Sequence, residues 1–109
     1  MSRIKIFSHK DGDRVSYKEE VSGLVIPETT PLMLLVYSRD QRWYYQHPVV
    51  KQGNMWTCDV FFGVEDVPRG SEYVLVIADM PDSPKPAGPL EDFLKGASPE
   101  TILIEVTRA

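Results

Sequence analysis

The chain has 109 residues, of which 42% are hydrophobic and 26% are charged, with a formal net charge of -4. This length and composition predict one ordered domain over residues 1–109, because disordered chains carry fewer apolar and more charged residues. The acidic balance argues against a nucleic-acid-binding face, which is usually basic. No apolar run approaches the roughly 18 residues that a membrane-spanning helix needs.

Cys58 is the only cysteine, so an intramolecular disulfide and a zinc site built from cysteines are both excluded. The apolar run at Ile4–Phe7 is too short for a signal peptide. We therefore expect a soluble, cytoplasmic protein. If the chain is a domain cut from a longer protein, its compartment stays open.

Extended segments separated by turn residues account for most of the chain. Two-residue alternation or continuous apolar runs predict about seven short strands, within residues 4–7, 15–26, 32–37, 43–46, 55–62, 73–78 and 101–107, with a further short piece starting at Val49 and Val50. No strand–helix–strand alternation is present, so a parallel α/β sheet is not expected. The pattern predicts an all-β, antiparallel sandwich.

Two of these strands contain the most specific structural signals. Residues 55–62 place Trp56, Cys58, Val60 and Phe62 on one face, which we expect to be buried. Gly23 lies inside another strand, where glycine indicates a bulge or a close approach of a second backbone.

The strands at 32–37 and 73–78 are apolar on both faces, so the face turned away from the core also needs a cover. The proline-rich excursion at residues 81–96 is expected to supply it. Within this excursion, residues 90–95 predict a short helix that ends at Gly96 and presents an apolar stripe. The stripe consists of Leu90, Phe93 and Leu94. A homodimer or a partner domain is the alternative cover.

The order of several motifs resembles that of bacterial immunoglobulin-like accessory modules. The motifs are Asp11-Gly12-Asp13-Arg14-Val15, Val21-Ser22-Gly23, Leu34-Leu35-Val36-Tyr37, Trp43-Tyr44-Tyr45-Gln46, Trp56-Thr57-Cys58-Asp59-Val60-Phe61-Phe62-Gly63 and Gly70-Ser71-Glu72-Tyr73-Val74-Leu75. The resemblance covers nearly the whole chain and implies an immunoglobulin-like β-sandwich. The proline-rich stretch at residues 81–97 is longer than a simple strand connection and departs from the family pattern, so the short helix near the C-terminus is expected from residue spacing alone. It implies no catalytic or binding residue, because these motifs mark strand cores and turns.

No arrangement of residues in the sequence predicts catalysis, a metal or a cofactor. His47 and Cys58 are a conceivable base and nucleophile, but a cysteine among large apolar side chains has its thiolate disfavoured. Asp11 and Asp13 flank Gly12, and two carboxylates in a tight turn supply too few oxygens for calcium. We therefore expect the chain not to be an enzyme.

The best functional candidate is an aromatic cluster beside two arginines. The candidate binding residues are Arg39, Arg42, Trp43, Tyr44 and Tyr45. Aromatic rings and arginines are enriched at protein interfaces, so we expect a non-catalytic module that binds another protein or domain. The alternative is a small carbohydrate-binding module in which these rings form a stacking platform. If the rings instead pack beneath loops, they support neither protein binding nor carbohydrate binding.

Overall fold

Nine strands and one helix make up the part of the chain that the computed structural model describes, which is residues 3–40, 42–46, 49–63, 69–79, 88–96 and 100–109. The all-β expectation is confirmed. In chain order the elements are β1 (Arg3–Ile6), β2 (Asp13–Val15), β3 (Lys18–Ile26), β4 (Met33–Ser38), β5 (Trp43–Tyr45), β6 (Val50–Gln52), β7 (Met55–Phe61), β8 (Glu72–Ala78), α1 (Leu90–Lys95) and β9 (Ile102–Arg108). Over these ranges, no helix is long and apolar enough to cross a membrane.

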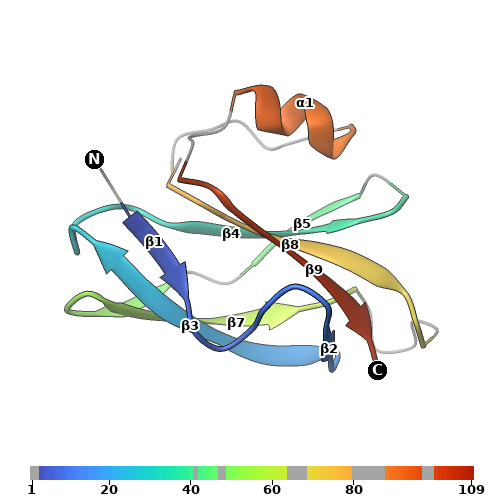
Figure 1. Ribbon diagram of the computed structural model, residues 1–109, viewed down its shortest axis with the longest axis horizontal. Helices are drawn as coiled ribbons and strands as arrows, with labels where there is room; N and C mark the ends of the chain where they lie inside the picture. The colour runs from blue at the N-terminus through green and yellow to red at the C-terminus, as the bar shows by residue number, and fades with distance from the viewer. Residues whose placement is uncertain (1–2, 41, 47–48, 64–68, 80–87, 97–99) are drawn as a thin grey trace.

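The strands form two sheets that face each other across the core (Figure 1). The four-stranded sheet has the order β1-β3-β7-β6, and the five-stranded sheet has the order β2-β9-β8-β4-β5. Every strand pair is antiparallel except β2 with β9, so the second sheet is mixed. Each sheet turns one face inward, toward the core, and one face outward.

Two expectations need correction: the strand count of about seven, and a purely antiparallel arrangement. Residues 15–26 do not form one strand, because the chain crosses from one sheet to the other after Val15. Gly12, at φ +87°, turns the chain so that β2 runs alongside β9, and its N–H donates to the Glu105 carbonyl at 2.8 Å. The two pieces expected at residues 43–46 and from Val49 belong to different sheets, as β5 and β6.

The core follows the predicted alternation closely. Trp56, Val60 and Phe62 are fully buried and Cys58 nearly so, which confirms the buried face predicted for this strand. Val21 and Val25 of β3 and Leu34 and Val36 of β4 meet them from their own inward faces. Alternation puts successive side chains on opposite faces, so one inward row per strand fills the space between the sheets.

Gly23 lies where a neighbouring strand's backbone comes too close to leave room for a side chain, one of the two features that its position in the strand indicates. It pairs with Ile6 on β1 and with Trp56 on β7. A Cβ added there would overlap the carbonyl oxygen of Lys5 and lie 2.7 Å from Cζ2 of Trp56. Only glycine allows β3 to lie between these neighbours without displacing one of them.

The chain covers part of the outward face of its own five-stranded sheet with α1 (Figure 1). Phe93 packs on Trp43 with ring centroids 5.1 Å apart, and Leu90 joins the same cluster. The Trp43 indole N–H donates to the Gly88 carbonyl at 3.0 Å. The intramolecular cover is thus confirmed for Leu90 and Phe93. It is wrong for Leu94, which points to solvent and is 37% exposed; residues 80–87 of the excursion lie outside the described chain.

Candidate binding site

The outward face of the five-stranded sheet changes from apolar to polar along its strands. The row Leu35–Val76–Leu103 lies beneath α1 and is wholly apolar. The next row, Tyr37–Val74–Glu105, is mixed, and beyond it Glu72 pairs with Thr107. The side chains thus become polar beyond the row that α1 covers, and this part of the face is called the open half below.

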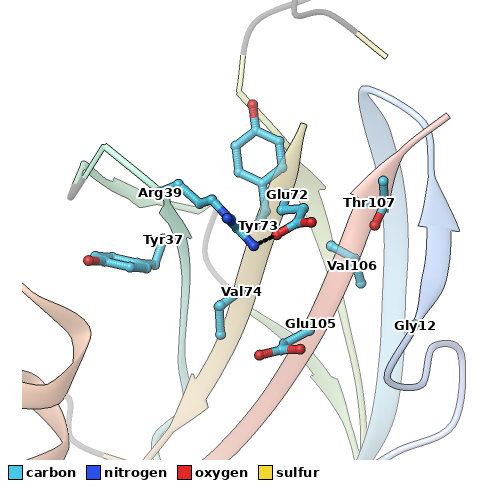
Figure 2. A pocket seen from close by; sticks show the side chains of 9 residues that line it. All are labelled: Gly12, Tyr37, Arg39, Glu72, Tyr73, Val74, Glu105, Val106 and Thr107. Atoms are coloured by element: carbon cyan, nitrogen blue, oxygen red, sulfur yellow. Dashed lines mark ion pairs between the residues drawn. The ribbon is translucent and has the colours of Figure 1, made fainter. Parts of the chain in front are cut away.

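A groove of about 320 Å³ lies over this open half (Figure 2). Arg39 and Glu72 form an ion pair across it, and the Tyr37 ring borders the covered half through its contact with Trp43, at 4.7 Å between centroids. The Glu105 carboxylate is exposed on β9 and has no ion-pair partner among the described residues. The groove is lined by Gly12, Tyr37, Arg39, Glu72, Tyr73, Val74, Glu105, Val106 and Thr107.

A second, more open hollow of about 580 Å³ adjoins the groove at the end of the sandwich. It shares Arg39, Glu72 and Tyr73 with the groove. The turn after β4 forms one wall, held by a hydrogen bond from the Ser38 hydroxyl to Asp40 and by the Arg42 Nε–Asp40 ion pair at 3.1 Å. The Ser38 hydrogen bond, aided by Arg42, holds the pKa of Asp40 below its usual value, so this carboxylate stays charged at neutral pH.

The structure brings together three of the five predicted binding residues. Arg39, Arg42 and Tyr44 all line the end hollow. Trp43 does not, because it is only 8% exposed beneath α1. Tyr44 lies on the opposite face of β5 from Trp43 and packs partly against the core, while the Tyr45 side chain lies outside the described part. Trp43 and Tyr44 therefore do not form a common exposed platform.

Residues on other strands complete the site and were not singled out from the sequence. Glu72 and Glu105 supply its carboxylates, and Tyr37 supplies its aromatic border. The alternation of the last strand does predict that Glu105 and Thr107 point outward. Nothing in the sequence predicts that β8 and β9 lie beside β4, because that proximity depends on the sheet order.

The acidic turn before β2 has a structural role in the described conformation. Asp11 Oδ1 accepts a hydrogen bond from the Glu105 N–H at 2.9 Å, and Asp13 Oδ2 accepts one from the Lys10 N–H at 3.0 Å. The Asp11 bond attaches the turn to β9 and the Asp13 bond closes the turn itself, which supports the turn interpretation. Across the described ranges, no group of three or more His, Cys, Asp or Glu side chains could hold a metal ion.

Cys58 is placed as the sequence predicts, within the core. Burial, with a smaller contribution from Asp59, raises the pKa of its thiol to about 11. The nucleophilic thiolate is therefore a minor species at neutral pH. His47, its conceivable partner, lies outside the described residues.

Comparisons with known proteins provide no family for this chain. No protein-family model matches it, and no curated protein matches it. The function has to be inferred from the residues of the groove and the end hollow.

Proposed function

We propose that this chain is a non-catalytic binding module that recognises a segment of another protein through the groove over β8 and β9. The observation that carries the proposal is the groove itself. It combines an aromatic side chain, Tyr37, a paired charge, Arg39 with Glu72, and an unpaired carboxylate, Glu105, within about 320 Å³. An aromatic contact beside a few polar groups is a common arrangement at protein interfaces.

The charges of the groove favour a partner segment with a basic side chain. Arg39 already neutralises Glu72, whereas Glu105 has no such partner among the described side chains. Arg14 stands beside Thr107 in the pairing of β2 with β9, but it is not one of the groove's lining residues. A lysine or arginine of the partner would pair with Glu105 while its neighbours contact Tyr37 and Val74.

The sheet order supports the further proposal that the sandwich is immunoglobulin-like. In that fold, strands A, B, E and D form one sheet, and strands C, F and G form the other, extended beside C in variable-type domains. Here β1-β3-β7-β6 corresponds to A-B-E-D, and β9-β8-β4-β5 corresponds to G-F-C with one added strand. In this scheme β2 is an extra edge strand beside β9.

Selection from a random peptide library displayed on phage tests the proposed function. We expect enrichment of peptides that contain a basic residue. Glu105→Gln is expected to weaken binding of a selected synthetic peptide about tenfold in fluorescence anisotropy, because it removes one charge-assisted contact. Glu91→Gln on α1 removes the same charge from an exposed position outside the groove and should leave the affinity unchanged. Failure to enrich any peptide, or equal loss in both variants, would contradict the proposal.

Carbohydrate binding has less support as a second function. A sugar-binding platform needs exposed, coplanar aromatic rings. Trp43 lies beneath α1, and Tyr37 is tilted by 54° against it. A response on a glycan array that is lost in a Tyr37→Ala variant would nevertheless favour this alternative over peptide recognition.

A further inference from the structure

The outward face of the four-stranded sheet is apolar at its centre, although it is exposed. Five large apolar side chains are exposed in the described part of the chain, and four of them belong to this face or its immediate end. Their exposed fractions lie between 46% and 66%. They are Phe7, Ile26, Val50 and Met55.

The strand register groups these side chains into a continuous patch. Leu24 pairs with Lys5 on β1 and with Met55 on β7, and Met55 pairs with Gln52 on β6. These four residues form one outward row across the sheet. Val50 lies in the adjacent outward row, opposite Thr57. Phe7 continues the outward alternation of β1, and its N–H donates to the Ser22 carbonyl at 2.9 Å. Contiguous apolar surface of this kind marks an interface more often than single exposed residues do.

No described element covers this patch. Figure 1 shows α1 on the far side of the sandwich, above the five-stranded sheet, with the four-stranded sheet forming the opposite outer layer. The two sheets thus differ: α1 covers the apolar outward row of one, and within the described ranges no helix or strand covers that of the other.

Opposite charges lie at the two ends of the patch. Arg3 pairs in register with Ile26 at one end, and Glu20, six residues back along β3, lies at the other end beside Asp59. Asp59 is already 4.0 Å from Lys18, but neither Arg3 nor Glu20 has an ion-pair partner among the described side chains. Along β3, the midpoint between the Ile26 and Glu20 rows is Gly23.

We propose that a second copy of this chain docks on this face, with a two-fold axis that runs across the strands at Gly23. Such an axis places the Ile26 row of one copy against the Glu20 row of the other. Because Arg3 lies in the Ile26 row, the Arg3 of each copy then lies near the Glu20 of the second copy. The Leu24 row, which also contains Lys5, Met55 and Gln52, and the Ser22 row, which also contains Thr57 and Val50, then stack at the centre. An axis along the strands would instead place Glu20 against the partner's Asp59, two like charges, and is disfavoured.

The size of the face sets the strength of the dimer. The four strands have four, nine, seven and three residues, each rising about 3.3 Å, and lie about 4.8 Å apart, which gives a face of about 360 Å² per copy. This area is about half of the roughly 800 Å² per partner of a standard interface. We therefore expect a weak, reversible dimer with a Kd of about 100 µM.

Sedimentation velocity from about 5 to 500 µM tests the proposal. The unmodified chain is expected to shift from monomer to dimer across this range. Met55→Asp, at the centre of the patch, is expected to weaken association at least tenfold, whereas Leu94→Asp on α1 adds the same charge elsewhere and should change nothing. Both substituted side chains are exposed, so circular dichroism should report folded variants.

A charge exchange tests the orientation of the two copies. Arg3→Glu is expected to raise the Kd about tenfold, and adding Glu20→Arg in the same chain is expected to restore it, because the two sites face each other only across the two-fold axis. A chain that stays monomeric up to the highest concentration would overturn the proposal and leave the face to a different protein. A dimer that is insensitive to Met55→Asp, or a charge exchange that rescues nothing, would overturn it as well.

Discussion

Replacing Gly23 with alanine is expected to destabilise the fold by at least about 3 kcal/mol, the upper part of the range for overpacked sites. The added methyl would overlap the carbonyl oxygen of Lys5, which is backbone, and would press on the buried Trp56 ring. Neither neighbour can move aside easily, because one belongs to the β1 ladder and the other is fully buried. Urea unfolding should show a much lower midpoint with an unchanged slope.

Gly96→Ala is the matched control for this substitution. Gly96 has φ -104° and no neighbouring atom within 4 Å of an added Cβ, so alanine there should change the free energy of unfolding by less than about 0.5 kcal/mol. A Gly23→Ala variant as stable as the unmodified chain would mean that β1 does not lie against β3 at Lys5. The register of the four-stranded sheet would then be wrong.

Replacing Phe93 with aspartate is expected to cost about 2 kcal/mol and to expose Trp43. The Phe93 ring is half-buried and packs on Trp43, so the change removes apolar burial and an aromatic pair while placing a charge against the sheet. The loss is limited, because α1 can detach while the two sheets stay packed. Urea unfolding measures the cost, and iodide quenching of tryptophan fluorescence measures the exposure of Trp43.

The adjacent substitution Leu94→Asp separates loss of packing from the effect of a new charge on α1. Leu94 points to solvent, so its replacement should cost less than about 0.5 kcal/mol and leave quenching unchanged. Equal effects of the two substitutions would show that α1 does not present Phe93 to the sheet.

Local patterns predict much of the fold because side-chain alternation depends only on the strand itself. The burial of Trp56 and its neighbours on β7 and the outward position of Glu105 follow from period two alone. The cover by Phe93 could also be predicted, because two strands that are apolar on both faces require one. The close approach at Gly23 is one of the two features, a bulge being the other, that a glycine inside a strand indicates.

Other features depend on contacts between distant segments, which a single sequence does not contain. The parallel pairing of β2 with β9 joins residues about 90 positions apart, and the three-residue strands have too few positions to show a period. The aromatic residues at 43–45 illustrate the same limit for the site. Alternation separates Trp43 from Tyr44, but only the position of α1 decides that Trp43 is covered.

The site could be predicted only in part for the same reason. The turn at Arg39–Arg42 is rich in charge, which singled out two of its residues. Glu72, which pairs with Arg39, and Tyr37, which borders the groove, belong to apolar strands and show no local functional signal. The groove exists because α1 covers only half of the outward face, so the extent of that cover determines the proposed binding surface.

Nuclear Overhauser contacts between the Trp43 indole and the Phe93 ring test this arrangement most directly. With ring centroids 5.1 Å apart, we expect strong cross-peaks whose intensity per molecule does not change on dilution, because the contact lies within one chain. Absence of these cross-peaks in a folded sample, or their disappearance on dilution, would show that α1 does not cover its own sheet, and the groove beside it would lose its border.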